Sequence, residues 1–166
     1  MNPLLEFKII SKHRMVNHYY PKLCTALNYL EEDQLWSREA GEANSIGGIV
    51  IHIVEHIRRN TQRMLTPEIR YETGIESTFT DLDISRNELL ALLESTFREF
   101  EQVIHQTAAV NMYDIYHLVE HTGYHLGQII DRTQRMTGRS FQFVQQGINE
   151  KALQQLIKQD TYDEDR

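Results

Sequence analysis

Histidines are the residues of this chain whose number and spacing suggest chemistry. The sequence of 166 residues contains eight of them, and five are concentrated in two short segments. His52 and His56 lie four residues apart, and His117, His121 and His125 follow one another at the same interval. In a helix, side chains four residues apart stand on the same face. Each segment could therefore present a pair of imidazoles to one metal ion.

A pair of imidazoles from one helix and a third from a facing helix would form a site with three protein ligands. Such a site leaves positions for water or substrate, which is the arrangement of catalytic metal sites. Because neutral imidazoles leave the charge of a divalent ion intact, the ion could lower the pKa of bound water toward ~7. It could equally bind and deprotonate a thiol. Spacing alone leaves open whether His117 or His125 is the partner of His121.

Three other motifs compete with this interpretation. The inverted zincin pattern H-x-x-E-H occurs at 52–56 and at 117–121, but no partner ligand accompanies either copy, and we interpret both as accidental. A ferritin-like two-metal bundle requires Glu-x-x-His on two helices, and no glutamate has a histidine three residues later. A nucleophilic triad is not favoured, since no nucleophile elbow surrounds Cys24 or the serines.

The apolar residues recur at helical intervals through almost the whole chain. Ser85 and Glu88 form a capping box before one apolar run, Asn111 or Asp114 opens the next, and Gly138 ends it. Pro21 is expected to kink or divide the first helix. We therefore predict long helices over 4–30, 44–65, 85–106 and 111–137.

Four long helices without an alternating strand pattern predict an all-α four-helix bundle. The connection at 66–84 is long enough to cross the bundle, so a simple up-and-down order is not assured. A weaker helix over 149–158 would be an extra C-terminal segment, and the acidic residues 160–166 are expected to form a frayed tail. We predict one domain over 1–159 followed by that tail.

Composition excludes several classes of protein. The 24 acidic and 17 basic residues give a net charge of −7, which argues against a nucleic-acid binder and against docking on an anionic membrane. No apolar run reaches the ~18 residues of a membrane span, and the N-terminus lacks the features of a signal peptide. The single cysteine, Cys24, excludes an intramolecular disulfide. We therefore expect a cytoplasmic protein.

Two segments resemble a known family. The segment from Asn44 to His52, Asn-Ser-Ile-Gly-Gly-Ile-Val-Ile-His, resembles the N-S-I-x-x-L-x-x-H pattern in the second helix of the DinB/YfiT-like superfamily. The segment from His121 to Ile129, His-Thr-Gly-Tyr-His-Leu-Gly-Gln-Ile, resembles its H-x-x-x-H-x-G-Q-I signature. Tyr-Pro-Lys-Leu at 20–23 and Gln-Leu-Trp at 34–36 resemble one branch, largely of unknown function.

The resemblance implies a four-helix bundle of that type, often dimeric, that holds a divalent metal ion with three histidines. By matching position these are His52, His121 and His125. The metal would be zinc or nickel, with manganese or iron as alternatives. Relatives suggest a thiol-dependent S-transferase acting on a small electrophile. A metal-dependent hydrolase and a non-catalytic, metal-stabilised stress or interaction protein are the alternatives.

The partners expected from this resemblance are a small-molecule substrate, such as a low-molecular-weight thiol, and a second copy of the chain to form a homodimer. The candidates for orienting the ligands are His56, His117, Glu55 and Glu120. Gly123 and Gly127 each cost roughly 1 kcal/mol relative to alanine within a helix, so we expect close approach of a neighbouring helix or room beside the metal. The sequence identifies no general base, and the catalytic residues stay unassigned.

Overall fold

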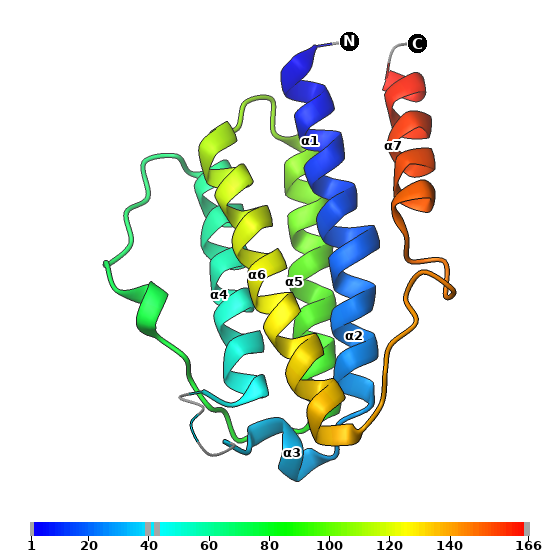
Figure 1. Ribbon diagram of the computed structural model, residues 1–166. Helices are drawn as coiled ribbons and strands as arrows, with labels where there is room; N and C mark the ends of the chain where they lie inside the picture. Colours follow the sequence, from blue (N-terminus) through cyan, green and yellow to red (C-terminus); the bar gives the residue numbers. More distant parts are fainter. Residues whose placement is uncertain (1, 39–40, 42–43, 165–166) are drawn as a thin grey trace.

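The computed structural model describes residues 2–38, 41 and 44–164, and this part of the chain is helical, with no strand (Figure 1). In chain order the elements are α1 (Pro3–His13), the π-helix η1 (Arg14–Tyr19), α2 (Tyr20–Asn28), α3 (Glu32–Trp36), α4 (Ile46–Leu65), the 3-10 helix η2 (Ile75–Ser77), α5 (Arg86–Gln106), α6 (Met112–Thr137) and α7 (Glu150–Glu164). The predicted all-α bundle with an extra C-terminal helix is confirmed.

Four helical rods form the bundle, and they do not simply alternate in direction along the chain. The rod α1–η1–α2 and helix α6 run downward in Figure 1, whereas α4 and α5 both run upward. The chain therefore returns along the whole length of the bundle between α4 and α5, as the length of this connection suggested. As a result α4 packs against both α5 and α6. In the described part of the chain, no helix is both long and apolar enough to cross a bilayer.

The core is made of apolar stripes at the predicted helical interval. Residues with at most 1% of their surface exposed include Ile53 and Ile57 of α4, Phe97 and Phe100 of α5, and Leu118 and Ile129 of α6. Caps fix where these helices begin and end. Ser85 and Glu88 form the expected capping box, Asn111 accepts hydrogen bonds from the first turn of α6, and Gly138 ends α6 in the left-handed conformation, with φ of 66°.

The first rod is divided beside Pro21, one of the two outcomes that the sequence predicted. Helix α1 ends at His13, the π-helix η1 follows, and α2 begins at Tyr20 with Pro21 in its first turn, where a proline removes no intrahelical hydrogen bond. The predicted C-terminal tail differs from the structure. The acidic C-terminus is not frayed from residue 160, because α7 continues to Glu164. Asp160 forms ion pairs with Lys12 and with His13 of α1, and these ion pairs extend the helix beyond the predicted end.

Glycines show where helices approach closely and where they do not. A Cβ atom on Gly47 would overlap the Trp36 ring, which is held in place because its Nε1 donates a hydrogen bond of 2.9 Å to the Ile84 carbonyl. A Cβ atom on Gly123 would lie 2.8 Å from the Tyr19 hydroxyl. The predicted close approach is thus confirmed at Gly123. At Gly127 no atom lies within 4 Å of the added Cβ, which excludes close approach there and leaves the other alternative, room beside the metal.

Alanine at these two kinds of position should have opposite effects on stability. Gly47→Ala forces the Trp36 ring out of its site, and we expect it to lower the free energy of unfolding by roughly 1–3 kcal/mol. Gly127→Ala meets open space and should raise the same quantity by about 1 kcal/mol, because alanine is the better helix former. Urea unfolding followed by circular dichroism measures both, and equal effects of the two substitutions would contradict this assignment.

Candidate metal centre

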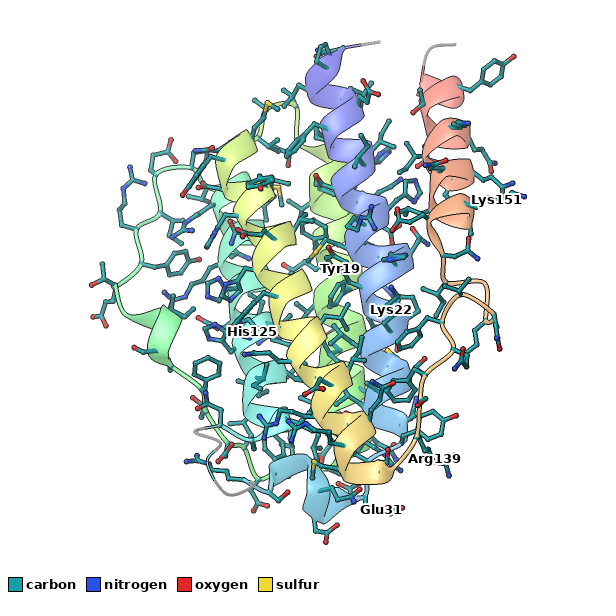
Figure 2. All side chains as sticks on the ribbon, in the orientation of Figure 1. Tyr19, Lys22, Glu31, His125, Arg139 and Lys151 are labelled. Atoms are coloured by element: carbon teal, nitrogen blue, oxygen red, sulfur yellow. The ribbon has the colours of Figure 1, made fainter. Side chains whose placement is uncertain are left out.

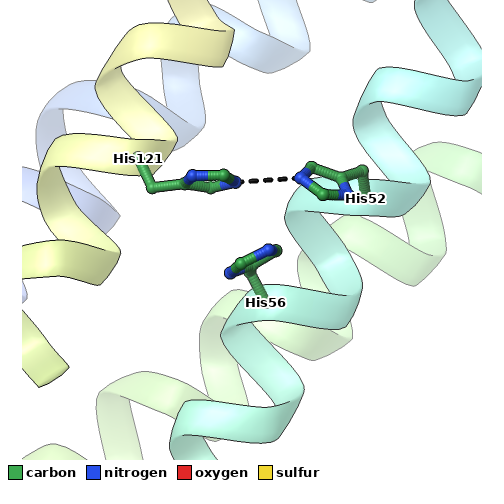
Figure 3. A group of neighbouring side chains, drawn as sticks. All are labelled: His52, His56 and His121. Atoms are coloured by element: carbon green, nitrogen blue, oxygen red, sulfur yellow. Dashed lines mark hydrogen bonds between the residues drawn. The ribbon is translucent and has the colours of Figure 1, made fainter. Parts of the chain in front are cut away.

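The candidate site lies between α4 and α6, two antiparallel neighbours in the bundle. His52 and His56 project from α4, and His121 projects from α6 toward them (Figure 3). His52 and His56 are only 1% and 4% exposed. They are turned inward because Ile49 and Ile53, on the same side of α4, are buried in the core. The apolar stripe of the helix thus determines which way its histidines point.

The nitrogen atoms of three histidines converge. Nε2 of His52 lies 3.0 Å from Nε2 of His121, and ligand atoms of His52, His56 and His121 all lie within 4.8 Å of one another. Ligand nitrogens around zinc lie about 2.0–2.1 Å from the ion, so two nitrogens 3.0 Å apart already face a common point. These three histidines could hold a metal ion.

His125 brings a fourth ring to the same place, on the side of the bundle covered by the 66–85 connection (Figure 2). Its ring centre lies 4.9 Å from that of His52 and 4.5 Å from that of His121, with the planes inclined at 79° and 73°. Rings that share a tetrahedral ion have centres about 5 Å apart. The position of His125 therefore suits it as a ligand alongside His52 and His121.

His56 has a different relation to His121. Their ring centres lie 4.0 Å apart and their planes are inclined at only 27°, so the two rings are stacked. A metal ion lies close to the plane of each imidazole that binds it, and nearly parallel stacked planes do not meet at a common ligand position. His52 and His121 thus belong to either possible set. Nitrogen distances favour His56 as the third ligand, and ring orientation favours His125.

Hydrogen bonds fix the proton positions on two of these rings. Nδ1 of His52 lies 2.9 Å from the Thr78 carbonyl, and Nδ1 of His125 lies 2.8 Å from Oε1 of Gln128. Since both partners are acceptors, each Nδ1 donates, and each neutral ring keeps a lone pair on Nε2. Such partners orient metal ligands and raise their basicity. The sequence did not reveal these partners, and a backbone carbonyl leaves no sequence signal.

The four candidates for orienting the ligands lie at different distances from the cluster. His56 stacks on His121, and the His117 ring centre is 5.6 Å from that of His121. Glu55 accepts a hydrogen bond from Arg59 and borders a hollow of about 280 Å³ that His52 also lines. Glu120 is exposed on α6. His56 and His117 therefore lie next to the cluster, whereas Glu120 lies on the exposed surface of α6.

A segment of the long connection covers the site. Phe79 stacks on His52 with ring centres 4.2 Å apart and planes inclined at 21°. The segment is anchored because Asp81 accepts hydrogen bonds from the Ser45 hydroxyl, at the start of α4, and from Arg38. The segment that stacks on His52 is thus also held against the start of α4.

An open hollow, which Phe79 also lines, gives access to the cluster. It has a volume of about 600 Å³, and His121, His125, Tyr124 and Gln128 of α6 contribute to its wall. Ligand pockets commonly enclose ~300–1,000 Å³. The hollow is therefore large enough for a small-molecule substrate next to the histidines.

Burial is the largest of the effects that together lower the pKa of His56 from 6.5 to about 4, and the neighbouring His52, His117, His125 and Arg59 act in the same direction. The imidazole is consequently neutral near pH 7. Charging it inside the cluster would place a cation among other imidazoles in a site with little water.

This lowered pKa predicts a loss of stability in mild acid. Below pH 6.5 the His56 side chain of the unfolded chain takes up a proton, whereas the folded protein resists protonation until about pH 4. Because the unfolded state binds more protons over this interval, the free energy of unfolding decreases as the pH is lowered. The contribution of His56 to this decrease approaches about 3 kcal/mol. Urea unfolding of metal-free protein between pH 7 and pH 4 measures it. His56→Gln should flatten the curve, and parallel curves for the two proteins would contradict the role of His56.

Comparison with models of protein families, with curated proteins and with solved structures finds no match to this chain. Among the described residues, the three histidines that could hold a metal ion are the feature that points to a function.

Proposed function

We propose that this protein is a divalent-metal-dependent enzyme of the DinB/YfiT-like kind that transfers a small thiol onto a small electrophile. The observation that carries the proposal is the approach of His52 Nε2 to within 3.0 Å of His121 Nε2 across two helices, at the edge of a hollow large enough for a substrate. His52, His121 and His125 are the proposed ligands, and zinc or nickel is the proposed metal.

The described residues suit such an ion in three respects. The donor set consists of imidazoles, which zinc and nickel favour. Thr78 and Gln128 hold two of the rings through Nδ1, so Nε2 is the atom with which each ring would bind a metal ion. Phe79 covers His52 and keeps water away from that side. When bound, a divalent cation would supply positive charge that lowers the pKa of a coordinated thiol or water.

The surroundings of the hollow favour a thiol over water as the nucleophile. Once its pKa is lowered by a cation, a thiol ionises near neutral pH without help from a separate base. Among the described residues that line the hollow, the carboxylate is Asp131, and it pairs with Arg135 at 3.0 Å. The position of His121 and His125 in the wall of the hollow also supports an accessible, catalytic ion rather than a closed, structural one.

Single substitutions distinguish the two possible ligand sets. Protein purified without added metal should contain close to one equivalent of a divalent metal. His52→Ala, His121→Ala and His125→Ala should each lose that metal, because two remaining imidazoles bind too weakly. His56→Ala should keep it with an affinity reduced by at most ~10–100-fold, the range for orienting residues. Elemental analysis and competition with a chelator provide the measurements.

His105→Ala is the matched control for these variants, since His105 is an exposed histidine near the end of α5. It should retain the metal fully. Retention in His125→Ala combined with loss in His56→Ala would show that His52, His56 and His121 form the ligand set.

Turnover tests the reaction itself. Metal-loaded protein is mixed with a low-molecular-weight thiol and an aryl chloride. In the transfer reaction the thiol sulfur replaces chloride on the ring, and a proton and chloride are released. We expect product formation that depends on both thiol and metal and that disappears in His121→Ala. Hydrolysis of an activated ester without thiol would instead favour the hydrolase, and metal binding without either activity would contradict an enzymatic role.

A further inference from the structure

A lysine and a histidine of the first rod lie side by side, outside the histidine cluster of the proposed metal centre. Nζ of Lys22, on α2, lies 2.8 Å from Nε2 of His18, on η1. His18 is only 6% exposed, whereas Lys22 is half-buried. Nζ of Lys22 lies 5.4 Å from the centre of the Phe143 ring, in the segment that leads to α7 (Figure 2). The pair therefore holds a partly exposed amine against a buried imidazole.

The chemistry of the two groups determines the direction of this hydrogen bond. A lysine ammonium group has three N–H donors and no acceptor. Nζ of Lys22 therefore donates, and Nε2 of His18 accepts with its lone pair. The imidazole is then neutral, with its proton on Nδ1. Lys22 consequently faces a group that can take up a proton from it.

The charges around the pair favour a neutral amine. Burial is the largest of the effects that lower the pKa of Lys22 below its ordinary value. The charge of Arg14 acts in the same direction, and Glu150 opposes both. Arg14 donates to the two carboxylate oxygens of Glu150 over 2.5 and 3.0 Å, so this carboxylate is already paired with a guanidinium group. Lysines that are desolvated or lie next to another cation are activated as nucleophiles in this way.

The imidazole of His18 is neutral near pH 7 for the same reasons. Burial lowers its pKa most, and the charges of Lys22 and Arg14 lower it further, whereas Glu150, whose Oε1 lies 3.5 Å from Nε2, acts in the opposite direction. A neutral ring keeps the lone pair that accepts from Lys22. An amine and a base are thus in contact before any reagent arrives.

We propose that Lys22 is a site of covalent acylation by small activated acyl compounds, thioesters or acyl phosphates, with His18 as the general base. The nitrogen of the neutral amine attacks the acyl carbon and forms a C–N bond. The bond from this carbon to sulfur or to the phosphate oxygen breaks, and the leaving group departs with the electron pair. The proton lost by the nitrogen passes to Nε2 of His18 and from there to solvent. The product is a neutral amide on Lys22.

Competition among the lysines of one molecule tests the proposal. Acetyl phosphate and S-acetyl-N-acetylcysteamine are incubated separately with the full-length protein at neutral pH, and mass spectrometry of its peptides gives the initial rate at each lysine. Lys151 and Lys158 are exposed on α7 and serve as the reference. Lys22 should react at least about tenfold faster than either, since a positioned general base contributes ~10²–10⁴-fold. Reaction with only one reagent identifies the acyl source.

Lys12 is the matched control for burial, because its ammonium group donates to the Asp160 carboxylate rather than to an imidazole. Acylation would break this ion pair, so Lys12 should react more slowly than the exposed lysines. His18→Gln keeps an acceptor beside Lys22 but cannot take up its proton. It should lower the rate at Lys22 about tenfold or more, while the rates at the exposed lysines and the circular dichroism spectrum stay unchanged.

Three outcomes overturn the proposal. In the wild-type protein, Lys22 reacts no faster than Lys151 and Lys158, a comparison that requires no variant. Lys12 reacts as fast as Lys22, which would assign the reactivity to burial alone. Finally, His18→Gln folds and leaves the rate at Lys22 unchanged, which would limit His18 to a structural role.

Discussion

The two imidazole nitrogens that face each other across 3.0 Å, on His52 and His121, impose the strictest constraint on this fold. They can meet only if α4 and α6 are neighbours at one longitudinal register, since a shift by one residue moves a side chain about 1.5 Å along the helix and 100° around it. The apolar stripes on either side provide that register. Ile53 of α4 and Leu118 of α6 are fully buried, so sliding either helix would expose core residues.

The same constraint explains the crossing connection between α4 and α5. By returning along the bundle, residues 66–85 leave α4 beside α6 and also carry Thr78 and Phe79 to the histidines. A buried imidazole N–H without an acceptor would cost about 1–3 kcal/mol, and the Thr78 carbonyl removes that cost at His52. The connection is anchored at Asp81, which accepts a hydrogen bond from the Ser45 hydroxyl at the start of α4. The long loop is therefore part of the site, to which it contributes a main-chain carbonyl and a phenyl ring.

The sequence predicts the helices of this protein better than it predicts the relations between them. Periodic apolar residues and caps such as Ser85 and Gly138 act within one turn, so the helix boundaries follow from local rules. The meeting of two histidine-bearing helices was also accessible from spacing. Spacing does not decide between His56 and His125 as the third ligand, because each lies four residues from a ligand common to both sets. Only the rotation of one helix relative to the other distinguishes them. The partner on Thr78 is a main-chain atom, and the ion pairs of Asp160 join residues almost 150 positions apart.

An ion and a proton compete for the same place in this cluster, and this competition links the fold to its chemistry. Nδ1 of His52 donates to Thr78, so Nε2 of the neutral ring is an acceptor, and the proton between the two facing nitrogens belongs to His121. A cation bound by both nitrogens must displace that proton, which couples metal affinity to pH. Burial among further imidazoles disfavours additional protons, as the lowered pKa of His56 shows. The lowered pKa keeps the His56 ring neutral near pH 7, and the ligand group found among the described residues consists of imidazoles, which leave the charge of a divalent ion intact. The positive charge of the ion is thereby left for whatever enters the adjoining hollow.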